Sequence, residues 1–256
     1  MANKKRCGMK LVHRNAWRAT PYNIMKNTKI IAHRGVWKNS GLPQNSIAAL
    51  KKSEELGYDG CELDVHLTAD GVVVVNHDRD FYGALIEEST YTKLCTIKHP
   101  NGETIPTLEE FLSHASLPLI LEIKASAIDL QRSLELTKQT VAIVKESTFK
   151  DSLSYISFNE DVLRKVLLED PSATVFLLNG ELTPTQIKEN GWHGLAYNTK
   201  VLRENPNWIA EAKQLGLVTN VWTVNDAENM RWFLDSGIDF IYTDEPEMVM
   251  DLANNN

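Results

Sequence analysis

Residues 29–67 read KIIAHRGVWKNSGLPQNSIAALKKSEELGYDGCELDVHL, and the order of patterns in this stretch decides the fold. A short apolar run at Lys29–Ala32 is followed by a stretch of helical period at Ser46–Leu56 and then by a second strand-like run at Gly60–Leu67. Strand, helix and strand in this order are typical of a βα unit in a parallel sheet.

The same alternation continues to the end of the chain without a linker. Further short apolar runs lie at Leu117–Ile123, Ser152–Ser157, Thr174–Leu178, Gly194–Tyr197, Leu217–Thr223 and Asp239–Tyr242. Stretches of helical period that separate them include Ile128–Lys145, Asp161–Leu168 and Trp208–Leu215. Eight βα units in a chain of 256 residues predict a single α/β domain, a (β/α)8 TIM barrel, with a doubly wound open sheet as the alternative.

Two segments depart from this rhythm. A β-rich run at Gly71–Val75, after the second barrel strand, precedes polar turns that last until the helical pattern Thr107–His114. We expect an extra strand and a short excursion on the catalytic rim. Residues 1–28 contain Lys and Arg but no Asp or Glu, so we expect a basic N-terminal arm ahead of a barrel domain at 29–256. A solvated tail is the simpler interpretation of the arm, and contact with anionic lipid headgroups is the alternative.

Charge, cysteine content and hydropathy narrow the class of protein. Twenty-seven Lys and Arg against 34 Asp and Glu give a net charge of −7, which argues against a nucleic-acid-binding protein. The three cysteines lack CxxC spacing, so neither a disulfide framework nor a thiolate metal site is expected. No apolar run reaches the roughly 20 residues of a transmembrane segment, and the basic start lacks the apolar part of a signal peptide. The sequence indicates a cytoplasmic protein, or an exported or periplasmic one if a leader is missing.

Three carboxylates share one side of two strand-like runs. Because side chains alternate along a strand, Glu62 and Asp64 point to one face, and Glu122 and Lys124 share a face in the same way. Like charges in a barrel mouth are disfavoured unless a cation or a proton lies between them. Carboxylates without thiolates suit one hard divalent cation, Mg²⁺ or Ca²⁺. Solvated or ion-paired carboxylates on a surface strand are the alternative.

Two histidines follow apolar runs at their carboxyl ends, which form the catalytic face of a barrel. His33 follows Lys29–Ala32, and His77 follows Val72–Asn76. A pair of imidazoles can act as base and acid in one displacement near neutral pH. A hydrogen-bonded polar residue at a strand end is the alternative for either one. The other histidines lack this context and are expected to be structural or on the surface: His13, His66, His99, His114 and His193.

These residues belong to motifs whose order and spacing resemble the glycerophosphodiester phosphodiesterase family. The motifs are His33-Arg34-Gly35, Pro43-Gln44-Asn45-Ser46, Glu62-Leu63-Asp64-Val65, Thr68-x-Asp70-Gly71, Val75-x-His77-Asp78, Glu122-Ile123-Lys124 and Val221-Trp222-Thr223-Val224-Asn225. Gly237-Ile238-Asp239 and Thr243-Asp244-x-Pro246 also look like the end of that family, so the resemblance spans Lys29 to about Met250.

The resemblance implies a barrel that hydrolyses glycerophosphodiesters to glycerol 3-phosphate and an alcohol with one divalent cation. The family's functional residues match metal carboxylates at Glu62, Asp64 and Glu122, an acid–base pair at His33 and His77, and phosphate contacts at Arg34 and Lys124. By analogy, a glycerol hydroxyl attacks to give a cyclic phosphate that water then opens. One histidine deprotonates the attacking group and the other protonates the leaving alkoxide, and which does which is not decided.

Several alternatives stay open at this point. Members of the family usually carry Glu where this chain has Gln44, which predicts either a weaker or shifted activity or a residue that only holds the loop. Trp222 is expected to lie over the glycerol carbons or to pack in the core, and Phe158 is expected to pack in the core, with a place in the lining of the cavity as the alternative. The partner is a small-molecule glycerophosphodiester, with no nucleic acid and an undecided oligomeric state. The rival functions are a lysophospholipase D, a glycerophosphoinositol phosphodiesterase, and a non-catalytic domain that binds glycerophosphodiesters.

Overall fold

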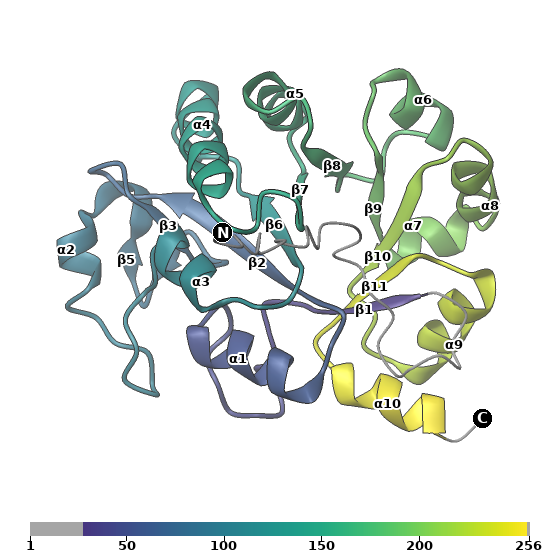
Figure 1. Cartoon of the computed structure of the whole chain (residues 1–256), viewed down its shortest axis with the longest axis horizontal. Helices are drawn as coiled ribbons and strands as arrows, with labels where there is room; N and C mark the ends of the chain where they lie inside the picture. Colours follow the sequence, from purple (N-terminus) through teal and green to yellow (C-terminus); the bar gives the residue numbers. More distant parts are fainter. Residues whose placement is uncertain (1–27, 255–256) are drawn as a thin grey trace, which may run out of the picture.

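Eight parallel strands close into a barrel in the computed structural model, which describes residues 28–254 (Figure 1). In order around the barrel they are β1 (Lys29–Ala32), β11 (Phe240–Thr243), β10 (Val218–Trp222), β9 (Gly194–Asn198), β8 (Thr174–Leu177), β7 (Leu153–Ser157), β6 (Leu119–Ile123) and β2 (Gly60–Leu67). Pairing of β1 with both β11 and β2 completes the ring. The predicted (β/α)8 barrel is therefore confirmed, and the open sheet is wrong.

Helices surround the barrel (Figure 1). They are α1 (Ile47–Leu56), α3 (Leu108–His114), α4 (Leu130–Glu146), α5 (Glu160–Glu169), α6 (Pro184–Glu189), α7 (Thr199–Glu204), α8 (Asn207–Gln214), α9 (Ala227–Ser236) and α10 (Pro246–Asn254). Ser46, taken from the sequence as the start of a helix, is the N-cap of α1 and accepts a hydrogen bond from the backbone N–H of Ala49. None of the helices within residues 28–254 is long and apolar enough to cross a bilayer.

Strand alternation divides the buried side chains into an outer and an inner layer. Outward-facing residues of β2, such as Leu63 and Val65, join the large apolar cluster that also contains helix side chains. A separate, smaller cluster contains Ile31, Ile120 and Tyr242. Glu62 is paired with Ile120 across the β2–β6 ladder, so this carboxylate faces the same side as the smaller cluster. The fold therefore directs carboxylates into the barrel, as the alternation predicted.

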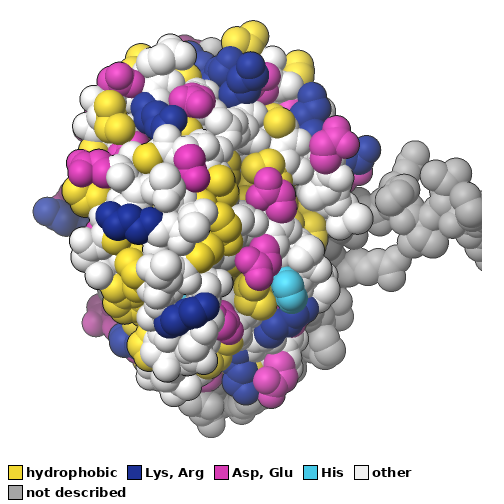
Figure 2. Space-filling model, turned by 90° about the vertical axis from the view of Figure 1, so that its left-hand side faces the viewer, with side chains coloured by type: hydrophobic (Ala, Val, Ile, Leu, Met, Phe, Trp, Pro, Cys, Tyr) yellow, Lys and Arg dark blue, Asp and Glu magenta, His cyan; other side chains and the backbone are white. Residues whose placement is uncertain are grey.

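The predicted excursion follows β2. It contains β3 (Val73–Val75), antiparallel to β2, a hairpin of β4 (Asp80–Phe81) and β5 (Ala84–Leu85), a 3₁₀ helix η1 (Ile86–Glu88) and α2 (Tyr91–Leu94). Its own apolar cluster comprises Val74, Phe81, Ile86, Leu94 and Ile105. Figure 2 views the molecule from this side, where charged side chains of both signs lie among hydrophobic ones. The expected basic arm at 1–28 falls, except for Thr28, outside the described residues.

Gly194 at the start of β9 allows the neighbouring strand to come close. A Cβ atom at this position would lie 2.1 Å from the carbonyl oxygen of Val218, the residue paired with Gly194 on β10. We expect Gly194→Ala to lower the free energy of unfolding by about 1–3 kcal/mol, because the strands must shift to relieve the clash. Urea denaturation followed by circular dichroism measures this change. An unaltered denaturation midpoint would contradict the close packing of β9 on β10.

Candidate active site

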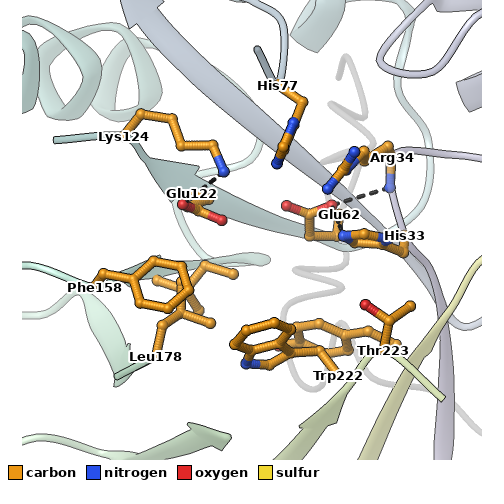
Figure 3. A pocket seen from close by; sticks show the side chains of 12 residues that line it. His33, Arg34, Glu62, His77, Glu122, Lys124, Phe158, Leu178, Trp222 and Thr223 are labelled. Carbon is orange, nitrogen blue, oxygen red and sulfur yellow. Dashed lines mark hydrogen bonds and ion pairs between the residues drawn. The ribbon is translucent and has the colours of Figure 1, made fainter. Parts of the chain in front are cut away.

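The residues predicted for function meet at the carboxyl ends of the barrel strands. Nearly all of them line a cavity of about 120 Å³: His33, Arg34, Glu62, His77, Glu122, Lys124 and Trp222. Asp64 does not line the cavity, but it belongs to the carboxylate cluster beside it. Figure 3 shows that the charged and imidazole side chains lie on one side of this cavity and apolar side chains on the other. The cavity thus has a polar and an apolar wall.

Three buried carboxylates cluster at the polar wall, and two of them line it. Glu62, Asp64 and Glu122 each offer an oxygen within 4.8 Å of the others, because Asp64 on β2 is paired with Glu122 on β6. Burial and the two neighbouring carboxylates raise the pKa of Glu62 well above its ordinary value. Burial and Asp64 raise the pKa of Glu122 to about 7. Ionisation of all three carboxyl groups at once is therefore unfavourable unless a further cation lies among them.

Lys124 supplies part of the compensating charge. Its Nζ lies 2.7 Å from Asp64 Oδ1 and 2.8 Å from Glu122 Oε1. Burial lowers the pKa of Lys124, but these two carboxylates outweigh burial and raise it above its ordinary value. Burial also raises the pKa of Asp64, but Lys124 and His77 outweigh it, so the Asp64 pKa falls below its usual range. Lys124 is thus a charged ammonium beside an ionised Asp64.

Arg34 lies at the other end of the cluster, two residues after the end of β1. Its backbone N–H donates to Glu62 Oε2 at 3.0 Å, and its Nη1 donates to Gln44 Oε1 at 2.8 Å. Gln44 thus holds the guanidinium through a hydrogen bond without neutralising its charge. Asn45 donates from Nδ2 to Asp64 Oδ2 at 2.8 Å, so the loop before α1 positions a carboxylate as well. Asn45 belongs to the Pro43-Gln44-Asn45-Ser46 motif, but the sequence pattern alone does not indicate this contact.

His33 is fixed by a carboxylate from the opposite end of the chain. Its Nδ1 donates to Asp244 Oδ1 at 2.6 Å, and Asp244 Oδ2 accepts from Asn225 Nδ2 at 2.7 Å. Burial raises the pKa of Asp244, but the hydrogen bonds from His33 and Asn225 outweigh it and lower the pKa. The other ring nitrogen, Nε2, lies 3.9 Å from Glu62 Oε2. Asp244 and Asn225 were quoted in motifs without a role, although Asp244 follows the last barrel strand directly.

His77 is held from two directions. Its Nδ1 lies 2.8 Å from Asp78 Oδ1, and its backbone carbonyl accepts a hydrogen bond from His66 Nε2 at 3.1 Å. Burial lowers the pKa of His77. His66 was expected to be structural or on the surface. It is buried on β2, two residues beyond Asp64, and its contact with the backbone of His77 was not visible in the sequence pattern.

The apolar wall is aromatic and aliphatic. It comprises Ile156, Phe158, Leu178, Trp222 and Tyr242. The indole Nε1 of Trp222 donates to the carbonyl oxygen of Ala196 at 2.7 Å, and its ring contacts the Phe158 ring edge-on at a centroid distance of 5.6 Å. For Phe158 the expected place in the core is wrong and the alternative is correct, because the residue lines the cavity and is 46% exposed. It follows β7 at the point where the chain leaves the barrel.

The chain is similar to known proteins over most of its length. Residues 33–248 match the model of the glycerophosphoryl diester phosphodiesterase family. A glycerophosphodiester phosphodiesterase of Caldanaerobacter subterraneus subsp. tengcongensis is 34% identical over 88% of this chain and 98% of its own. The crystal structure of a glycerophosphodiester phosphodiesterase from Parabacteroides distasonis is 42% identical, with a TM-score of 0.86 over 90% of this chain and 98% of its own.

A more distant structure shares the fold. It is an Oleispira antarctica phosphodiesterase in complex with the product sn-glycerol-3-phosphate, 22% identical, with a TM-score of 0.77 over 89% of this chain and 97% of its own.

Proposed function

The chain belongs to the glycerophosphoryl diester phosphodiesterase family, and from this premise we propose that its cavity hydrolyses glycerophosphodiesters to glycerol 3-phosphate and an alcohol. The observation that carries the proposal is the arrangement of a buried carboxylate cluster beside two histidines, each bonded through Nδ1 to an aspartate. The glycerol 3-phosphate product bound to the Oleispira antarctica phosphodiesterase supports the substrate class.

The carboxylate cluster fits one divalent cation. Glu62, Asp64 and Glu122 offer only oxygen ligands and lie within 4.8 Å of one another, which suits Mg²⁺ or Ca²⁺. Held by these three carboxylates, such a cation would act as a Lewis acid toward the non-bridging phosphate oxygens. Among the residues of the chain, Arg34 and Lys124 bind phosphate oxygens with fixed positive charge. Trp222 and the rest of the apolar wall pack against the glycerol carbons.

The two histidines transfer protons. One accepts the proton of the attacking glycerol hydroxyl, and the other gives a proton to the leaving alkoxide, which yields the alcohol and a cyclic glycerol phosphate. Water then opens the cyclic phosphate to glycerol 3-phosphate, with the two histidines exchanging their roles. Hydrogen bonds to Asp244 and Asp78 keep a proton on Nδ1 of each ring and so fix its tautomer. Because both Nδ1 atoms are occupied by aspartates, the Nε2 atoms are the ones that exchange protons with substrate.

The experiment that tests this function is release of glycerol 3-phosphate, coupled to glycerol-3-phosphate dehydrogenase. Glycerophosphocholine and glycerophosphoethanolamine are each supplied with Mg²⁺, with Ca²⁺ and with a chelator. We expect release that depends on the metal. Folded protein that binds these substrates with metal but releases no product would contradict the proposal in favour of a non-catalytic binding domain. Acylated glycerophosphocholine in the same assay tests the lysophospholipase D alternative.

Asp244→Asn is expected to lower kcat by about 10- to 100-fold with a smaller change in KM. The amide can donate to His33 Nδ1, which favours the wrong tautomer and removes the charge that stabilises the imidazolium, whereas ground-state binding uses other residues. Steady-state kinetics with glycerophosphocholine measures both parameters. Asp239→Asn serves as the control. Asp239 directly precedes β11 as Asp244 directly follows it, but its carboxylate accepts hydrogen bonds from Thr219 and not from a histidine. An equal loss in both variants would mean that Asp244 acts only through stability.

A further inference from the structure

A second cavity adjoins the first. It has a volume of about 350 Å³ and shares four wall residues with the first cavity: His77, Glu122, Lys124 and Phe158. Its remaining wall consists of His66, Asp78, Arg79 and Ala125. The two cavities therefore meet along one boundary, and one of the two proposed catalytic histidines stands on that boundary.

The position of the two histidines gives the cavities different roles. His33 lines only the first cavity, together with the apolar wall that fits glycerol carbons. His77 lines both. In phosphoryl transfer the attacking and leaving oxygens lie roughly in line on opposite sides of phosphorus. With glycerol in the first cavity, the alcohol that leaves emerges beside His77 and enters the second cavity. His77 is then the general acid and His33 the general base.

The wall of the second cavity carries charges of both signs in balance. Asp78 is matched by Arg79, and Glu122 is bonded to Lys124 at 2.8 Å. This wall offers no excess negative charge to hold a quaternary ammonium and no excess positive charge to hold an anion. It does offer hydrogen-bond acceptors and donors side by side, from the Asp78 carboxylate and the Arg79 guanidinium, which match the hydroxyl groups of a polyol.

Hydrogen bonds within the chain hold the segment that carries Asp78 and Arg79. Asn76 Nδ2 donates to the carbonyl oxygens of Asp78 at 2.7 Å and of Asp80 at 3.1 Å. The carbonyl of Arg79 accepts from the backbone N–H of Ile86 at 3.0 Å. These bonds use backbone atoms of residues 78–80, so the Arg79 side chain can be removed without releasing the segment. Within residues 28–254, the Arg79 guanidinium forms no ion pair and remains available to a ligand.

We propose that the second cavity is the leaving-group subsite and that it selects an uncharged, hydroxyl-rich alcohol such as glycerol or inositol over choline or ethanolamine. This inference rests on the proposed function and adds the substrate class to it.

The test compares kcat/KM for glycerophosphoglycerol and glycerophosphoinositol with kcat/KM for glycerophosphocholine. We expect the wild-type protein to favour both polyol substrates, and Arg79→Ala to reduce the polyol-to-choline ratio about tenfold, the effect of losing hydrogen bonds to a charged group. Lys98→Ala is the matched control, because Lys98 is an exposed cation on the same excursion that lines neither cavity. Its ratio is expected to equal that of the wild type. Thermal unfolding of both variants verifies that they are folded.

Three outcomes separate the inference from its premise. A wild-type preference for glycerophosphocholine, or a ratio that Arg79→Ala leaves unchanged, would overturn the subsite while hydrolysis itself upholds the proposed function. An equal fall of the polyol-to-choline ratio in Lys98→Ala would mean that surface charge in general, and not this subsite, sets the preference. Folded protein that hydrolyses none of the three substrates would overturn the proposed function, and the subsite with it.

Discussion

Replacing either His33 or His77 with Gln is expected to lower kcat for glycerophosphocholine by roughly 10²- to 10⁴-fold, the usual contribution of a positioned acid or base. Glutamine retains a donor and an acceptor but cannot exchange a proton near neutral pH. Neither imidazole belongs to the apolar clusters of the core, so both variants should remain folded. Steady-state assays of glycerol 3-phosphate release measure the loss. Turnover within a few-fold of wild type in either variant would contradict the role of that histidine.

The choice of leaving group distinguishes the two roles. The p-nitrophenyl ester of glycerol 3-phosphate releases a stable phenolate that does not need a proton. His77→Gln should therefore recover much of its activity on this ester, whereas His33→Gln should remain as impaired as on glycerophosphocholine. The opposite pattern would exchange the two assignments. His114→Gln is the control, because His114 is exposed at the end of α3 and lines neither cavity.

The parts of the site that alternation controls could be predicted from sequence. A period of two places Glu62 and Asp64 on the inner face of β2 wherever the strand begins, provided that its neighbours are also barrel strands. The observed strands agree with the predicted runs to within one or two residues at each end. Because β2 and β6 are adjacent in the barrel, Glu122 comes to lie opposite Asp64. Local pattern and the barrel topology suffice for the carboxylate cluster.

Contacts that depend on closure of the ring could not be predicted in the same way. His33 and Asp244 are 211 residues apart, and they meet because β1 pairs with β11. The sequence pattern predicts both strands, but it contains no information on the register between the first strand and the last. His66 differs again: its parity puts it on the same face as Asp64, but its partner is a backbone carbonyl, which leaves no trace in the sequence.

The short helices were missed for a simpler reason. α6 and α7 have 6 residues each, less than two turns. Too few apolar positions fall within such a length for a helical period to be recognised. In α6, the Thr183 capping box with Gln186 and Pro184 at the start of the helix is the signal that could have revealed it. None of these helices carries a residue of the proposed site, so the functional prediction did not depend on them.

Removal of the divalent cation is expected to reduce turnover by about 10³-fold or more, since a bound cation contributes several kcal/mol to stabilisation of the transition state. A chelator should abolish glycerol 3-phosphate release, and subsequent addition of Mg²⁺ or Ca²⁺ should restore it. A readout independent of activity is the unfolding temperature. A cation at about 100 times its Kd stabilises the folded state by about 2.7 kcal/mol. Activity and unfolding temperature unchanged by the chelator would contradict a metal site at the carboxylate cluster.

The pH dependence of that stabilisation identifies the ligands. A cation binds ionised carboxylates, and without it burial and neighbouring charge raise the pKa of Glu62 well above its ordinary value and that of Glu122 to about 7. Protons therefore compete with the cation below about pH 7, so affinity must rise, and protons must be released, as the pH increases from 6 to 8. Isothermal titration calorimetry in two buffers of different ionisation enthalpy measures both the affinity and the proton release.

Glu122→Gln should weaken cation binding and reduce proton release, whereas Glu109→Gln, which removes an exposed carboxylate on α3, should do neither. Cation affinity that is equal at pH 6 and pH 8 would mean that these two glutamates are not the ligands, because no binding to a protonated carboxyl group can escape that competition.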